Sequence, residues 1–161
     1  MDRMLIQRAV QEVGELLGLE DYKLATAESC TGGLLASTLT DVSGSSEWFQ
    51  GSVVAYSNEV KQNLLGVPEA ALAEHGAVSE PVVKAMAEGV RKAIGADVSV
   101  AISGIAGPTG GTPDKPVGTV WMAWSWPYGV KTKVYTFDGG RDAVKAQSVM
   151  AAINGLMAIL R

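Results

Sequence analysis

The stretch KLATAESCTGGLLASTL, residues 23–39, contains the change of pattern that decides the fold. Lys23 to Ala27 is a short run typical of a strand, and Leu34 to Leu39 continues as a helix. Between them lie Ser29 and two adjacent glycines. A strand that passes through a glycine-rich turn into a helix indicates an α/β protein.

The segments on either side continue this alternation. Helical spacing of apolar residues, or a helix start signal, predicts helices over residues 3–17, 58–65, 79–94 and 141–160. Strand-forming residues predict strands over residues 51–56, 97–102, 117–126 and 130–137. The last two strands meet at Pro127-Tyr128-Gly129, which predicts a hairpin. We therefore expect one domain over residues 1–161, a three-layer α/β/α sandwich with a mixed β-sheet.

Composition narrows the functional classes. The chain has 161 residues and a formal net charge of −4, without a block of consecutive basic residues, so we expect no nucleic-acid partner. The first residues form neither a signal peptide nor a membrane span, so we expect a cytoplasmic protein without a membrane partner. Cys30 is the only cysteine, which excludes an intramolecular disulfide.

Ser29 is the first candidate functional residue. Backbone N–H groups at a helix start can hold a phosphate, or stabilise the oxyanion that forms when a hydroxyl attacks a carbonyl. Gly32 and Gly33 would let a substrate approach the backbone closely. The alternative is an ordinary N-cap serine in a tight turn, and the turn alone leaves both interpretations open.

A serine nucleophile needs a base, and histidine usually supplies it. The only histidine, His75, falls at an apparent helix end, where we interpret it as a solvated terminal residue. Lys61 then remains as the candidate base, with Tyr56 nearby in sequence. The alternative for Lys61 is a solvated helix lysine.

The loop from Ser103 to Lys115, together with Arg141, is a candidate anion site. Successive N–H groups in such a loop can form a concave anion site, and arginine can add a bidentate contact. The alternative is a turn-rich connector. The sequence has no histidine pair, cysteine pair or spaced carboxylate cluster, so we expect no metal and no cofactor.

Taken together, several segments closely resemble the C-terminal domain of the CinA competence/damage-inducible family, the PncC-type nicotinamide-nucleotide amidohydrolases. The resemblance covers nearly the whole chain from about residue 5 onward. The matching segments are residues 27–33, 43–46, 56–58 with Lys61, 65–67, 76–79, 104–108 and 115–120.

The resemblance implies hydrolysis of nicotinamide mononucleotide to nicotinate mononucleotide and ammonia, in pyridine-nucleotide salvage. It implies that Ser29 is the nucleophile and that Lys61 and Tyr56 activate it. It also implies a small-molecule nucleotide substrate and a homo-oligomer. Some members of the family carry a further N-terminal domain, which we do not expect in this chain. The substrate-binding residues that it implies are Thr31, Gly32, Gly33, Ser103, Gly104, Gly107, Pro108 and Arg141.

The chain departs from the family pattern at two positions. Ser103 replaces the usual threonine and keeps the hydroxyl group. Gly140 stands where an acid commonly precedes the arginine, which predicts a weaker orientation of Arg141.

Three alternatives to the serine amidohydrolase stay open. The first is a non-catalytic nucleotide-binding or regulatory module with the same fold. The second is a hydrolase that uses the Cys30 thiol. The third is an interaction protein that uses its tryptophans, although Trp121, Trp124 and Trp126 fall in a predicted strand region, where packing is the commoner role.

Overall fold

Helices and strands alternate along the chain, and the computed structural model describes residues 2–161. The helices are α1 (Arg3–Glu20), α2 (Leu34–Thr40), α3 (Asn58–Leu65), α4 (Glu69–His75), α5 (Glu80–Ile94) and α6 (Arg141–Leu160), with a short 3-10 turn η1 (Ser45–Glu47). The strands are β1 (Leu24–Glu28), β2 (Phe49–Val54), β3 (Val98–Gly104), β4 (Thr119–Trp126) and β5 (Gly129–Thr136).

The strands form one five-stranded sheet in the order β2-β1-β3-β4-β5. β1 is parallel to both β2 and β3, whereas β4 is antiparallel to β3 and to β5. The predicted mixed sheet and the predicted final hairpin are therefore confirmed. Because β1 and β3 are parallel neighbours, their carboxyl ends lie side by side at one edge of the sheet.

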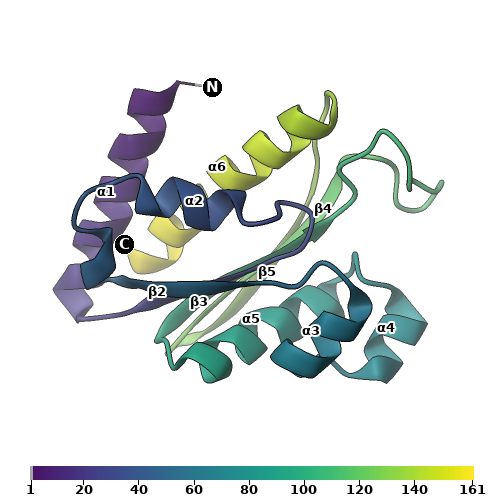
Figure 1. Ribbon diagram of the computed structural model, residues 1–161, viewed down its shortest axis with the longest axis horizontal. Coiled ribbons are helices and arrows are strands. Elements are labelled where there is room, and N and C mark those ends of the chain that lie inside the picture. Colours follow the sequence, from purple (N-terminus) through teal and green to yellow (C-terminus); the bar gives the residue numbers. More distant parts are fainter. Residues whose placement is uncertain (1) are drawn as a thin grey trace.

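Helices cover both faces of the sheet, as Figure 1 shows. α1, α2 and α6 lie on one face, and α3, α4 and α5 lie on the other. The side chains of β3 alternate accordingly, since Val98, Val100 and Ile102 pack with the first group. Ala101 packs with the second group. The predicted three-layer sandwich is confirmed.

The packing of α6 on β4 depends on one aromatic side chain. Trp124 is 1% exposed, and its Nε1 donates a hydrogen bond to Ala152 O at 3.0 Å. A Cβ at Gly155 would lie 2.2 Å from the Trp124 ring, so the ring fits only because this helix position has no side chain. The tryptophan therefore serves core packing, as the sequence suggested.

α6 is long and apolar enough, by length and composition alone, to cross a membrane. In the structure it packs against α1, α2, β3 and β4. Val149, Ala152, Ile153 and Leu156 are buried in the same apolar core as Val10 and Val13 of α1. The apolar residues of α6 are thus explained by its contacts within the fold.

One predicted strand begins and ends two residues earlier than expected. β2 ends at Val54, which pairs with Glu28, the last residue of β1. Ala55 makes one further bond, from its N–H to Glu28 O at 2.8 Å, and the chain then turns into α3. Tyr56 therefore lies beyond the strand, at the edge of the sheet where β1 also ends.

Candidate active site

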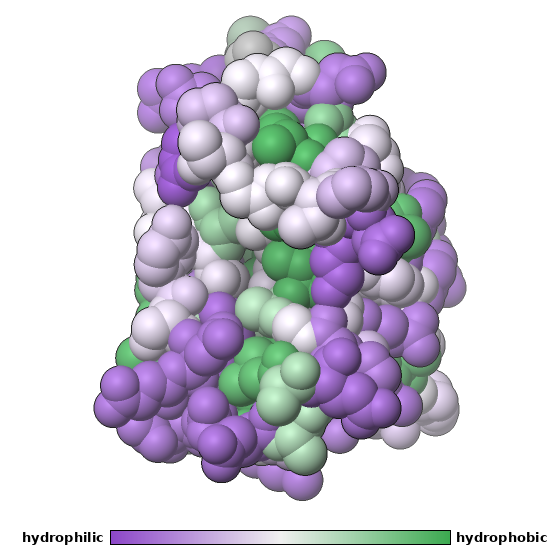
Figure 2. All heavy atoms as spheres, turned by 90° about the vertical axis from the view of Figure 1, so that its right-hand side faces the viewer, coloured by the Kyte–Doolittle hydropathy of each residue, from purple (hydrophilic) through white to green (hydrophobic). Residues whose placement is uncertain are grey.

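The carboxyl ends of β1 and β3 open onto a cavity of about 320 Å³. Ser29 is the first residue after β1, and Ser103 is the penultimate residue of β3. Figure 2 views this end of the molecule and shows apolar atoms in the middle of the face, between hydrophilic regions. Ligand crevices in α/β proteins commonly form at this edge of the sheet.

Glu28 organises the turn that carries Ser29. Its carboxylate is fully buried and accepts hydrogen bonds from Thr31 Oγ1 at 2.8 Å, Leu35 N at 2.8 Å and Ala36 N at 2.9 Å. Thr26 Oγ1 and Ser52 Oγ donate to it at 3.3 and 3.4 Å. These contacts tie the end of β1 to the start of α2.

This arrangement corrects the expectation that the start of α2 holds the substrate. α2 begins only at Leu34, after the N-cap Gly33, and two of its first N–H groups already donate to Glu28. The N–H of Cys30 is different, because it makes no backbone–backbone hydrogen bond among residues 2–161. The candidate oxyanion donor next to Ser29 is therefore a backbone N–H of the turn and not one of the helix.

Lys61 lies in the wall of the cavity and is 1% exposed. Its Nζ donates to Tyr56 O at 3.0 Å, and no carboxylate of residues 2–161 forms a salt bridge with it. Burial lowers the pKa of Lys61 below its ordinary value, because desolvation disfavours the charged form. The alternative of a solvated helix lysine is therefore wrong.

Cys30 also lines the cavity, but burial shifts its pKa in the opposite direction from that of Lys61. Its side chain is 6% exposed, and burial, together with the charge of Glu28, raises the pKa of the thiol to about 11. A thiol with such a pKa is protonated at neutral pH and is a weak nucleophile. This observation disfavours the cysteine hydrolase.

Arg141 joins the two sides of the cavity. Its Nη1 donates to Gly107 O at 2.7 Å, and its Nη2 donates to Tyr56 Oη at 3.3 Å. These two acceptors hold the guanidinium although Gly140 supplies no carboxylate, and a weaker orientation of Arg141 than beside an acid stays a prediction. The phenol of Tyr56 bonds to this guanidinium, while Lys61 bonds to the backbone carbonyl of Tyr56.

The loop after β3 forms the remaining wall. Ser103 is 1% exposed and donates its hydroxyl to Ala77 O at 2.8 Å. Gly107 has a φ of 83°, and a Cβ there would lie 2.4 Å from Val117 Cγ1. Only glycine therefore fits at the point where the loop also accepts the hydrogen bond from Arg141.

The structure brings together most of the predicted site residues. Those that line the cavity are Ser29, Tyr56, Lys61, Ser103, Gly104, Gly107 and Arg141. Thr31, Gly32, Gly33 and Pro108 do not line it. Thr31 is 1% exposed and its hydroxyl donates to the buried Glu28, so its side chain points into the protein and not into the cavity.

Sequence reasoning missed several residues of the site. Asn58, Ala77 and Val78 line the cavity without having been predicted to do so, whereas Thr109 and Gly110, which also line it, belong to the candidate loop 103–115. Asn58 follows the Ser57 N-cap of α3, and Glu28 precedes Ser29, so both lay within segments that had been singled out. His75 is the last residue of α4 with its side chain 43% exposed, which confirms its interpretation as a solvated terminal residue.

The structure is an α/β sandwich with a polar cavity at the carboxyl ends of β1 and β3. The turn that carries Ser29 and the buried side chain of Lys61 both line this cavity. The sequence matches the CinA C-terminal domain over residues 6–160. The chain belongs to this family.

The chain is similar to proteins of two lengths within the family. It is 51% identical over 147 residues to the nicotinamide-nucleotide amidohydrolase PncC of Escherichia coli K12, covering 91% of this chain and 89% of that protein. It is 52% identical over 142 residues to a CinA-like protein of Akkermansia muciniphila, covering 88% of this chain and 34% of that protein. The chain thus spans about a third of the longer relative.

A solved structure shares the fold. The competence damage-inducible protein A (ComA) of Klebsiella pneumoniae is 39% identical and superimposes with a TM-score of 0.93. The match covers 96% of each chain.

Proposed function

We propose that this protein is an amidohydrolase that converts nicotinamide mononucleotide and water into nicotinate mononucleotide and ammonia. The observation that carries this proposal is a buried lysine of lowered pKa in the same cavity as Ser29. The similarity to PncC amidohydrolases over nine tenths of the chain supports the substrate. Residues 1–161 would act as one amidohydrolase domain, in a cytoplasmic homo-oligomer.

In the first half of the reaction, neutral Lys61 accepts the Ser29 hydroxyl proton. The serine oxygen bonds to the carboxamide carbon, and the N–H of Cys30 donates to the oxyanion. The intermediate collapses when the carbon–nitrogen bond breaks, and the proton held by Lys61 passes to the departing ammonia. A serine ester of the pyridine carboxylate remains.

In the second half, water attacks this ester, and Lys61 takes a proton from the water. The ester bond breaks, the proton on Lys61 passes to the Ser29 oxygen, and the acid product gives its remaining proton to solvent and leaves as the carboxylate. In this proposal Tyr56 acts mainly through position: its carbonyl holds Lys61 and its phenol holds Arg141.

The nucleotide phosphate is assigned to Arg141 and the loop that it contacts. Arg141 is exposed at the cavity, and a guanidinium has five N–H donors, so its bonds to Gly107 and Tyr56 leave others for an anion. The pyridine ring would then lie toward Ser29, deeper in the cavity.

The test is release of ammonia from nicotinamide mononucleotide by the purified protein. Ser29→Ala and Lys61→Met should abolish release, while Lys84→Met, a change at an exposed lysine of α5, should not. A folded wild-type protein that binds the nucleotide without releasing ammonia would instead support the non-catalytic module. Equal activity in Ser29→Ala and wild type would contradict the proposed nucleophile.

A further inference from the structure

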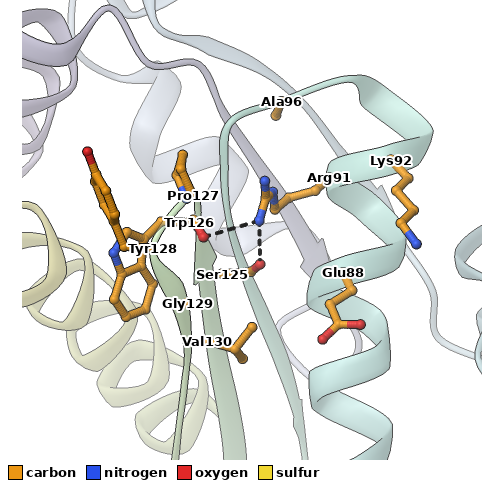
Figure 3. Close-up of a pocket in the computed structure, with 10 residues that line it drawn as sticks. All are labelled: Glu88, Arg91, Lys92, Ala96, Ser125, Trp126, Pro127, Tyr128, Gly129 and Val130. Atoms are coloured by element: carbon orange, nitrogen blue, oxygen red, sulfur yellow. Dashed lines mark hydrogen bonds between the residues drawn. The ribbon is translucent and has the colours of Figure 1, made fainter.

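A cavity of about 470 Å³ between α5 and the β4–β5 hairpin shows how a polar side chain in a cavity wall can serve the fold. Figure 3 shows Arg91 reaching from α5 to β4, where Nη1 donates to Ser125 Oγ at 2.8 Å and to Trp126 O at 3.3 Å. These bonds hold the helix on the sheet. Several polar side chains in the Ser29 cavity are used in the same way, but not all of them.

The polar side chains that line the Ser29 cavity divide into bonded and free groups. Those with hydrogen bonds inside the protein are Tyr56, Lys61, Ser103 and Arg141. Within residues 2–161, the lining residues whose side-chain nitrogen or oxygen atoms make no hydrogen bond are Ser29, Asn58 and Thr109. Ser29 is the proposed nucleophile, so Asn58 and Thr109 remain for other parts of a substrate.

The chemistry of these free groups suits hydroxyl groups better than ions. Among residues 2–161, no acidic side chain lines this cavity. In many nucleotide sites a carboxylate binds the ribose hydroxyls. The amide of Asn58 has two donor hydrogens and an acceptor oxygen, so it can accept from one hydroxyl of a cis diol and donate to the other.

A role in the fold does not explain the position of Asn58. A polar residue at a helix start often accepts a hydrogen bond from a free N–H of the first turn. Ser57 already does so in α3, because its Oγ accepts from Val60 N at 3.1 Å. Thr109 lies on the exposed loop after β3, whereas α3 fixes the backbone of Asn58, and a binding group on a helix is positioned more precisely.

The spacing between Asn58 and Lys61 matches the shape of a pyridine nucleotide. The two residues lie three apart on α3, on one face of the helix, with about 5–6 Å between their Cβ atoms. Lys61 is 1% exposed and Asn58 is exposed, so Asn58 lies on the solvent side of Lys61. The pyridine ring separates the carboxamide carbon from the ribose by a similar length. A carboxamide held near Lys61 therefore brings the ribose to the level of Asn58.

We propose that Asn58 binds the ribose 2′ and 3′ hydroxyl groups of the pyridine nucleotide and so selects ribonucleotides. This inference rests on the proposed function, because the carboxamide near Ser29 and Lys61 fixes where the ribose lies. The three parts of the substrate then meet three groups of residues. Ser29 and Lys61 act on the carboxamide, Asn58 binds the ribose, and Arg141 binds the phosphate.

The test compares nicotinamide mononucleotide with its 2′,3′-dideoxy analogue, which keeps the carboxamide, the ring and the phosphate. Ammonia release gives kcat/KM for each compound. We expect the wild type to favour the mononucleotide by about 5- to 30-fold, the effect of one or two neutral hydrogen bonds. Asn58→Ala should nearly abolish this preference, because it lowers kcat/KM for the mononucleotide and leaves that for the analogue almost unchanged. Damage to the fold would lower both.

Asn63→Ala is the matched control, because Asn63 is an exposed asparagine of the same helix that does not line the cavity. It should keep the wild-type preference. Calorimetric binding of both compounds to Ser29→Ala repeats the comparison without turnover.

The outcomes separate this inference from the proposed reaction. The inference is overturned if the wild type does not distinguish the two compounds, or if Asn58→Ala distinguishes them as the wild type does. Ammonia release from the mononucleotide would then still support the proposed function. A protein that releases no ammonia but prefers the mononucleotide in binding, and loses this preference in Asn58→Ala, would support the ribose site and contradict the reaction.

Discussion

The carboxylate of Glu28 accepts a hydrogen bond from the hydroxyl of Thr31 across 2.8 Å, inside the turn that presents Ser29. The same carboxylate accepts from the backbone N–H groups of Leu35 and Ala36. Within residues 2–161, the donors to this fully buried carboxylate are all neutral and it forms no salt bridge, so the number of those hydrogen bonds stabilises it. The position of Ser29 therefore depends on a residue that does not line the cavity.

Replacement of this carboxylate should loosen the turn. Glu28→Gln keeps the shape but turns an NH₂ group toward donors, so at least one buried N–H or O–H loses its acceptor. We expect the free energy of unfolding to fall by about 1–3 kcal/mol, with a further loss of kcat in the molecules that remain folded. Urea unfolding and ammonia release by the same preparation measure the two effects separately.

Thr31 supplies a matched pair of controls for this interpretation. Thr31→Ser keeps the hydroxyl donor to Glu28 and should behave nearly like wild type. Thr31→Val removes it and should cost about 1 kcal/mol of stability. If Thr31→Ser lost as much as Thr31→Val, the threonine methyl group and not the hydrogen bond would be important.

Replacement of Lys61 should abolish activity and raise the free energy of unfolding. Its pKa is lowered in the folded protein by burial, so the charged form is disfavoured there relative to the unfolded chain. Lys61→Met removes this penalty, and we expect an inactive protein that is more stable than wild type by about 1–2 kcal/mol at neutral pH.

The stability difference between Lys61→Met and the wild type should depend on pH. Below the lowered pKa, Lys61 is charged in both states of the wild type, and the penalty is complete. As pH rises through the lowered pKa toward the ordinary 10.5, the penalty disappears. The stability advantage of Lys61→Met in urea unfolding should therefore be largest at neutral pH and shrink at alkaline pH. An advantage that does not vary with pH would contradict the assignment.

Catalysis should follow the same ionisation. Only neutral Lys61 can accept the Ser29 proton, so kcat/KM should rise with pH through a pKa below 10.5. Lys61→Arg should not restore activity, because arginine keeps its proton at any usable pH. Steady-state rates between pH 6 and 10 test this prediction, and a flat profile limited by chemistry would contradict it.

Local signals allowed much of the fold to be predicted from the sequence. The helices over residues 58–65 and 141–160 were predicted with the bounds that the structure shows. The N-cap residue of α3 is Ser57 and that of α6 is Gly140. α3 ends before Gly66, whose backbone has a left-handed conformation. The end of β2 was predicted too late, because Val54 is its last residue paired with β1, and pairing is a property of the sheet.

The site was harder to predict, because burial decides its chemistry. In the sequence, Lys61 is one lysine on a short helix, and only the packing around α3 removes it from water. Glu28 likewise carries no local sign that its carboxylate will be buried under Thr31 and the first turn of α2. The turn borders the cavity through Ser29 and Cys30, so contact of Thr31, Gly32 and Gly33 with a substrate stays a prediction that the cavity lining does not support.

Cys30 should be dispensable for the reaction. Its thiol is buried and has a pKa of about 11, so very little thiolate exists at neutral pH. We expect Cys30→Ala to retain a measurable fraction of activity, and iodoacetamide to alkylate the native protein slowly at pH 7. Rapid alkylation that tracks loss of ammonia release, together with an inactive but folded Cys30→Ala, would restore the cysteine mechanism.

Arg141 connects Tyr56 to Gly107 and so combines structure with recognition. Arg141→Ala removes a charge-assisted contact worth about 1.5–3 kcal/mol, which corresponds to roughly a 10- to 150-fold rise in KM for nicotinamide mononucleotide. The phosphate-free riboside should be affected less, because it has no group for the guanidinium to bind.

Tyr56→Phe separates the two functions of this arginine. It removes the phenol that accepts from Arg141 but keeps the guanidinium, the Gly107 contact and the backbone carbonyl that holds Lys61. If the phenol only orients Arg141, we expect a smaller rise in KM for the mononucleotide than in Arg141→Ala, with kcat almost unchanged. A large fall in kcat on both substrates would show that the Tyr56 phenol takes part in proton transfer. Equal losses on mononucleotide and riboside in Arg141→Ala would place the phosphate elsewhere in the cavity.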